Sequence, residues 1–116
     1  MTEQRDVRAG VLNLRIADEG GRRLIRLSGE LDLANAASLE TELDRVLGDD
    51  GGEIVVDLEE LSFIDSTGIA LLINAMSRDG DNGRLRFVPS KGLAVQRVLR
   101  ATGLEERLPF VDGSPK

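Results

Sequence analysis

The spacing of apolar residues changes repeatedly along this chain, from the two-residue period of a strand to the three-to-four-residue period of a helix. Alternation at every second residue predicts strands over 11–17, 22–28 and 84–88. The dense apolar run Ile54-Val55-Val56 within 53–58 indicates a central strand that is buried on both faces. Helical spacing predicts helices over 34–47, from residue 66 onward, and over 91–102.

With a short last strand over 108–111, the predicted order is β-β-α-β-α-β-α-β. Asp18-Glu19-Gly20-Gly21 is typical of a hairpin turn, so the first two strands should be antiparallel. The later strand–helix–strand units predict parallel pairs with right-handed crossovers. We therefore expect an α/β fold, a mixed β-sheet of four to five strands with helices packed against it.

A chain of 116 residues fits one domain. We expect that domain to span 11–112, with flexible tails at 1–10 and 113–116. The first ten residues are polar and do not resemble a signal peptide. The apolar stretch 69–73 is too short to cross a bilayer. These features predict a cytoplasmic location.

The composition argues against several kinds of site. The chain has no cysteine and no histidine, which removes thiolate metal sites and the usual general base, and we expect no metal and no cofactor. A net charge of −6 disfavours nucleic acid and membrane surfaces as partners. The acidic segment 79–83 faintly resembles a calcium loop, but its composition favours a turn. Strand arginines, among them Arg22, Arg23, Arg26, Arg84 and Arg86, favour a solvated face.

The segment Leu61-Ser62-Phe63-Ile64-Asp65-Ser66-Thr67-Gly68 is the most informative for function. It predicts a loop anchored to the core by Leu61 and Phe63, followed by the start of a helix. A hydroxyl at a helix N-terminus lies among free backbone N–H groups and a positive dipole end, where phosphate is well accommodated. Gly68 would let another backbone or a partner approach closely. Asp, Ser and Thr at this position are also compatible with plain helix capping.

This segment resembles the central motif of the anti-sigma factor antagonists, which are STAS-domain proteins. The resemblance covers about 11–112, including Gly29-Glu30-Leu31-Asp32 before the first helix and the closing helix and Gly-Leu turn at 99–104. It implies that Ser66 is phosphorylated by an anti-sigma factor that is also a serine kinase, with Thr67 as a candidate second acceptor. Asp32, Asp65, Ser66, Thr67 and Gly68 are carried over as partner-binding residues.

The same resemblance implies a switch. The unphosphorylated chain would bind the anti-sigma factor and release a sigma factor, phosphorylation of Ser66 would end the binding, and a serine phosphatase would restore it. We expect the free chain to be a monomer and a binding protein rather than an enzyme.

Two alternatives remain open. A STAS subunit of another assembly, such as a lipid-transport ATPase complex or a stress-sensing complex, would share the fold and often a similar turn. A small hydrolase using Ser66 is more remote, since there is no Gly-x-Ser-x-Gly elbow and no histidine to activate the hydroxyl.

Overall fold

Two parallel strands at the centre of the sheet organise the molecule, in a computed structural model that describes residues 2–49 and 51–111. The strands are β1 (Thr2–Ala9), β2 (Leu12–Glu19), β3 (Arg22–Leu31), β4 (Ile54–Ile64) and β5 (Leu85–Val88). The helices are α1 (Ala36–Leu47), α2 (Ser66–Asp79), α3 (Leu93–Ala101) and α4 (Leu104–Arg107), with a 3-10 turn, η1, at Gly80–Asn82.

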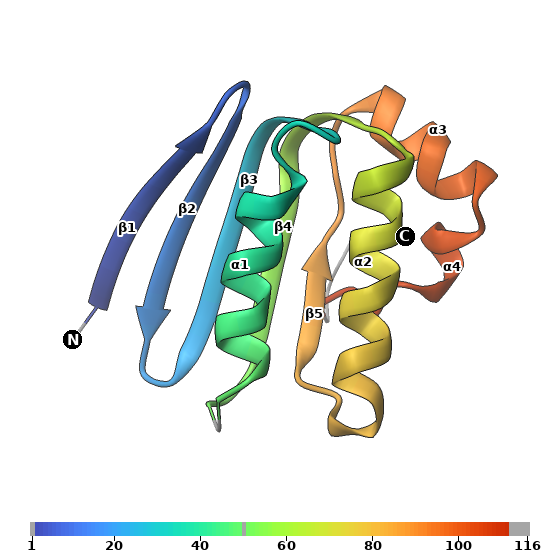
Figure 1. The fold of residues 1–116 in the computed structure, drawn as a ribbon. Coiled ribbons are helices and arrows are strands. Elements are labelled where there is room, and N and C mark those ends of the chain that lie inside the picture. Colours follow the sequence, from blue (N-terminus) through green and yellow to red (C-terminus); the bar gives the residue numbers. More distant parts are fainter. Residues whose placement is uncertain (1, 50, 112–116) are drawn as a thin grey trace.

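The sheet has the order β1-β2-β3-β4-β5 and is mixed, as predicted. β1 and β3 pair antiparallel with β2, whereas β4 pairs parallel with both β3 and β5. α1 and α2 lie side by side over one face of the sheet, and α3 and α4 follow β5 at its edge (Figure 1). The α/β fold is therefore confirmed, and β4, which the apolar run indicated, is an interior strand that is paired on both sides and buried over 54–58.

The core fills the space between the sheet and these helices. Alternate residues of neighbouring strands share the face turned to α1 and α2, which is why the two-residue period was informative. The core residues that are completely shielded from solvent include Leu14, Ile25, Leu27, Leu39, Val46, Ile54, Val56, Leu58, Leu72, Leu85, Phe87, Val95 and Leu104.

The N-terminal segment does not form the tail expected over 1–10. Thr2–Ala9 is strand β1, which pairs along its whole length with β2. Arg5 also donates to both carboxylate oxygens of Glu42 on α1, at 3.2 and 2.7 Å. The prediction was wrong because a polar edge strand held by backbone hydrogen bonds and by ion pairs of Arg5 and Asp6 has almost no apolar pattern. The tail expected at 113–116 lies outside the described residues.

Glu42→Gln should lower the free energy of unfolding at pH 7 by about 1–2 kcal/mol, because it weakens charge-assisted hydrogen bonds to a buried side chain. The guanidinium of Arg5, supported by Arg45, lowers the pKa of Glu42 below its ordinary value. The native state therefore gains stability above the unfolded pKa and loses it as the pH falls through the folded pKa. Urea denaturation from pH 7 to pH 3 should show the two chains converging at the acidic end. A constant difference would contradict this account.

Several element boundaries also differ from the predictions. α1 begins at Ala36 instead of residue 34, and the loop expected after 58 is the second half of β4. The strand expected over 108–111 is a single bridge between Phe110 and Phe87, preceded by the short helix α4. Each difference lies at an end of an element, where backbone pairing decides the structure more than side-chain periodicity does.

The loops that carry the predicted site residues all lie at one end of the molecule. The carboxyl ends of β3, β4 and β5 lead into α1, α2 and α3 there, and the β1–β2 turn joins them at the top of Figure 1. Gly29 has a φ of +94°, and a Cβ at this position would lie 2.0 Å from the carbonyl oxygen of Val11. Glu30 donates its backbone N–H to the same oxygen at 3.2 Å. Glycine therefore lets the β1–β2 turn close against the end of β3.

Candidate phosphorylation and partner-binding site

Ser66 is the first residue of α2, and its side chain is exposed, as the sequence predicted. The preceding strand, β4, brings the chain to the end of the sheet, and the apolar face of α2 then packs on the core through Ile69, Leu72 and Ala75. The hydroxyl of Ser66 therefore lies at the positive end of a helix whose other face is fixed. This position is accessible to a modifying enzyme and accommodates an anion.

Asp65 is the N-cap residue of α2 and connects two segments. One carboxylate oxygen accepts a hydrogen bond from the backbone N–H of Gly68 at 3.1 Å, and the other accepts from the backbone N–H of Leu33 at 3.1 Å. The Asp65 backbone N–H donates to the carbonyl oxygen of Leu31, also at 3.1 Å. The carboxylate therefore bonds within the chain, in addition to bordering Ser66 as expected.

The loop between β3 and α1 is closed by its own polar groups. The Asp32 carboxylate accepts from the N–H of Ala34 at 3.1 Å, and the Asn35 side chain bonds the backbone of Asp32 and Glu30. Asn35 is the N-cap residue of α1, but its side chain makes no bond to that helix. Asp32 is half-buried and lies beside the segment that Asp65 holds, so the structure brings the two predicted aspartates to adjoining loops.

Gly68 lies where α2 packs against the ends of β3 and β4. It is buried, and a Cβ built on it would lie 2.7 Å from Cγ1 of Ile64 and 2.9 Å from Cγ of Leu31. The absent side chain allows α2 to approach the ends of β3 and β4, which is the first of the two close approaches expected of this glycine. Thr67 is half-buried, so its hydroxyl position is less open than that of Ser66.

Gly68→Ala should lower the free energy of unfolding by about 1–3 kcal/mol, because the added methyl group crowds Leu31 and Ile64. Helix propensity alone predicts the opposite sign, a gain of up to about 1 kcal/mol. Ala70→Gly, at an exposed position of the same helix, is the matched control and should cost about 1 kcal/mol through propensity alone. Chemical denaturation of the three chains decides the sign, and a Gly68→Ala chain more stable than the original would refute the crowding.

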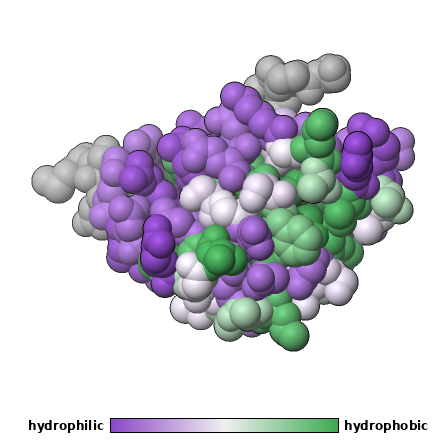
Figure 2. Space-filling model, turned by 90° about the horizontal axis from the view of Figure 1, so that it is seen from above, coloured by the Kyte–Doolittle hydropathy of each residue, from purple (hydrophilic) through white to green (hydrophobic). Residues whose placement is uncertain are grey.

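Large apolar side chains are exposed at the same end of the molecule as Ser66. Leu33 is 77% exposed, Leu93 66%, Val11 59% and Phe63 42%. They come from the β3–α1 loop, the start of α3, the β1–β2 turn and the end of β4. Figure 2 views this end and shows apolar groups lying among polar ones. Sequence reasoning missed this set and assigned Phe63 to the core.

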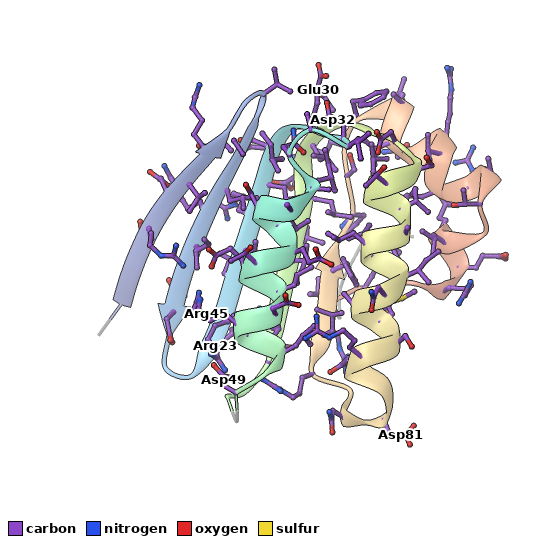
Figure 3. The ribbon with its side chains drawn as sticks, in the orientation of Figure 1. Arg23, Glu30, Asp32, Arg45, Asp49 and Asp81 are labelled. Carbon is purple, nitrogen blue, oxygen red and sulfur yellow. The ribbon has the colours of Figure 1, made fainter. Side chains whose placement is uncertain are left out.

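Acidic groups dominate the charge around Ser66. Among the described residues, none of the carboxylates of Glu30, Asp32 and Asp65 forms an ion pair with lysine or arginine. Glu30 and Asp32 lie at one end of the molecule, whereas Arg23, Arg45 and Asp49 lie near the other (Figure 3). An anion added at Ser66 would therefore join carboxylates that no ion pair neutralises among the described residues.

At the end of the molecule opposite Ser66, Arg23 and Arg84 form hydrogen bonds within the chain. Arg23 is buried and bonds both carboxylate oxygens of Asp49, which corrects the expectation that it belongs to a solvated face. This guanidinium holds the pKa of Asp49 well below its usual range. Arg84 donates to the backbone carbonyl oxygens of Val46, Asp49 and Gly52. A hollow of about 370 Å³ lies here, lined by Gln4, Arg5, Ile16, Asp18, Arg23 and Arg45.

The remaining candidate sites have ordinary structural roles. The segment 79–83 forms the turn between α2 and β5, where the buried Asp79 carboxylate accepts from the N–H groups of Arg84 and Leu85 at 3.3 and 3.0 Å. Within residues 2–49 and 51–111, no group of three or more acidic side chains is arranged to hold a metal ion. No helix of that part of the chain is long and apolar enough to span a membrane.

Comparison with known proteins decides the family. The STAS domain model matches residues 13–114, which is most of the chain. The chain belongs to the STAS domain family. It is 27% identical to the anti-sigma-F factor antagonist RsfB of Mycobacterium tuberculosis, over 82% of this chain and 77% of that protein. It is also 27% identical to an anti-sigma-B factor antagonist of Staphylococcus aureus, over 78% of this chain and 83% of that protein.

A solved relative of this STAS domain agrees in three dimensions. The crystal structure of an anti-sigma factor antagonist from Mycobacterium paratuberculosis superposes with a TM-score of 0.77, at 27% identity, over 87% of this chain and 86% of that one. The recognised family and its fold are thus confirmed by sequence and by structure. The STAS domain match, over residues 13–114, includes the β4–α2 junction and Ser66.

Proposed function

We propose that this STAS domain is an anti-sigma factor antagonist controlled by phosphorylation of Ser66. In its unmodified form it binds an anti-sigma factor that is also a serine kinase, and the sigma factor is released. A serine phosphatase reverses the modification, and the cycle runs in the cytoplasm on a monomeric chain. The observation that carries this proposal is the exposed hydroxyl of Ser66 at the start of α2, within a segment that resembles the antagonist motif.

The chemistry of the switch is a phosphoryl transfer. The Oγ–P bond forms as the terminal phosphoanhydride bond of ATP breaks, so that ADP and one proton are released. The kinase supplies the catalytic groups, and this chain supplies only an accessible hydroxyl. The modified residue then carries about −1.5 to −2 charges at neutral pH.

Charge and exposure together support release of the partner by modification. The new anion lies beside Asp65 and near Asp32, and these carboxylates have no lysine or arginine ion-pair partner among the described residues. Burial of such a cluster in an interface is costly unless the partner pairs every charge. The α2 N-terminus stabilises the phosphate within the free chain, so the domain remains folded.

The exposed apolar side chains supply the other half of the docking surface. Leu33, Phe63 and Leu93 border the loops that carry Asp32 and Ser66. An interface of this kind has an apolar centre and a polar rim, and a few apolar anchors carry most of the binding energy. A kinase with an apolar groove would complement the exposed side chains of this surface.

The two alternatives fit less well. A subunit of a lipid-transport or stress-sensing assembly would share the fold, but the relatives at 27% identity are named as antagonists of anti-sigma factors. Hydrolysis by Ser66 would need a base, and the chain contains no histidine. We therefore keep a regulatory binding role as the proposal.

The deciding experiment uses affinity capture followed by phosphorylation. The intact chain, immobilised, should retain from extract of its own organism a small ATPase-like kinase domain that binds a sigma factor. That kinase, purified and given ATP, should transfer one phosphate to Ser66, as read by mass spectrometry, and none to a Ser66→Ala chain. Modification of another residue, or capture of transport-complex subunits instead, would overturn the proposal.

A further inference from the structure

The link between Asp65 and Leu33 joins the candidate phosphorylation site to the most exposed large apolar side chain of the described residues. Asp65 belongs to the β4–α2 junction, whereas Leu33 belongs to the β3–α1 loop, 32 residues earlier in the chain. The bond runs from the Leu33 backbone N–H to the Asp65 carboxylate at 3.1 Å. It is a charge-assisted bond, which is stronger and more directional than one between neutral groups.

Leu33 is otherwise weakly attached. Its side chain is 77% exposed, so packing does not fix it, and its backbone N–H donates to the Asp65 carboxylate. The flanking residues differ, because the N–H of Ala34 bonds the Asp32 carboxylate within the loop at 3.1 Å. The direction in which Leu33 projects therefore depends on the position of a carboxylate directly next to Ser66 in the chain.

We propose that Asp65 is a positioning residue that transmits the state of Ser66 to Leu33. A phosphate on Ser66 places a second anion at the same helix N-terminus, where it repels the Asp65 carboxylate and competes with it for the backbone N–H groups of α2. The carboxylate moves away, the bond to the Leu33 N–H weakens, and Leu33 loses its preferred orientation. This inference rests on the proposed function only in taking Ser66 as the modified residue.

The consequence is a switch with two components. Modification adds repulsive charge to the docking surface, and it also loosens an apolar anchor that a partner would contact. The second component acts within the free chain, without any partner present. It predicts a local change, confined to the two loops that Asp65 joins, while the core side of α2 stays fixed by Ile69 and Leu72.

The experiment measures the Leu33 amide in the free, full-length chain by nuclear magnetic resonance. Phosphoserine is installed at position 66 during translation, so no kinase is needed. The rate of exchange of the Leu33 amide proton with water should rise about tenfold on modification, which corresponds to a loss of about 1.4 kcal/mol of protection. The Ala34 amide, whose acceptor is Asp32, is the internal control and should keep its rate.

Two variants separate coupling from simple proximity. In Asp65→Ala, the Leu33 amide should exchange rapidly with or without the phosphate. In Asp65→Asn, the single uncharged amide oxygen can accept from Gly68 or from Leu33 but not from both, so the Leu33 amide should lose protection before modification and the effect of the phosphate should shrink several-fold. Circular dichroism checks that both variants fold, and the comparison of modified and unmodified wild-type chains stands even if neither does.

An unchanged Leu33 exchange rate in the phosphorylated wild-type chain would overturn the inference. Equal acceleration of the Leu33 and Ala34 amides would also overturn it, because the loop would then loosen as a whole. Neither result depends on a partner. If Leu33 responds as expected but no anti-sigma factor kinase modifies Ser66, the coupling stands and the proposed function fails.

Discussion

A Ser66→Asp chain should bind the anti-sigma factor kinase at least about 100-fold more weakly than a Ser66→Ala chain, a difference of about 2.7 kcal/mol. Alanine keeps the site uncharged and small, so the apolar anchors and the neighbouring loops can still meet the partner. Aspartate adds a third carboxylate next to Asp65 and Asp32, and like charges brought together in an interface cost several kcal/mol. Isothermal titration calorimetry with the purified kinase measures both affinities.

Ser77→Asp is the matched control for this effect. Ser77 is exposed on the same helix, and the substitution adds the same charge about 16 Å farther along the axis, away from the proposed surface. It should change the affinity less than about threefold, since an exposed charge beyond a Debye length is largely screened. Equal affinities for the Ser66→Asp and Ser66→Ala chains would refute the switch, whatever the control shows.

The sequence predicted the centre of the fold better than its edges. The apolar run of β4 and the helical stripes of α1 and α2 encode burial directly, so the parallel arrangement followed from their order. β1 was missed because its backbone pairs with β2 while its polar side chains at 4, 5, 6 and 8 stay exposed. Burial leaves a periodic signal in the sequence, whereas pairing at a sheet edge leaves very little.

The candidate site was also predicted only in part, and for a similar reason. Ser66 and its place at the helix start followed from local signals, a short polar group before an apolar stripe. The second bond of Asp65 depends on Leu33, which lies 32 residues away in the chain and has no local signature. At Gly68, glycine predicted the close approach of another backbone or of a partner without saying which. Its neighbours, Leu31 and Ile64, are visible only in the folded chain.

Phe63 shows why the exposed apolar residues were missed. A strict two-residue period places Leu61 and Phe63 on the same face, and both were assigned to the core. In the structure the buried residues are Leu61 and Ile64, because the register between β3 and β4 shifts near Gly29. A bulge of this kind reverses the face of every residue beyond it. Phe63 is thereby turned outward beside the segment that carries Ser66.

Leu33→Glu should weaken binding of the kinase by about 30- to 100-fold, or about 2–2.7 kcal/mol, while leaving the free energy of unfolding within about 0.5 kcal/mol of the original. The expected separation of the two effects follows from exposure. Leu33 contributes little to the core, since 77% of its surface faces solvent in the free chain. Leu33 would instead contribute to binding through apolar contact with the partner. In Leu33→Glu, an unpaired carboxylate would take the place of that contact.

Ile73→Glu is the control, because Ile73 is the exposed apolar residue of α2, 37% accessible and about 10 Å along the helix from Ser66. That substitution should reduce stability more than the one at Leu33, since most of Ile73 is covered, and it should leave affinity nearly unchanged. For both chains, urea denaturation measures the free energy of unfolding and calorimetry measures the affinity for the kinase. Affinity that follows stability in both variants would mean that Leu33 matters only through folding. Affinity lost at Leu33 alone would identify the β3–α1 loop as an anchor, acting beside the charge switch at Ser66.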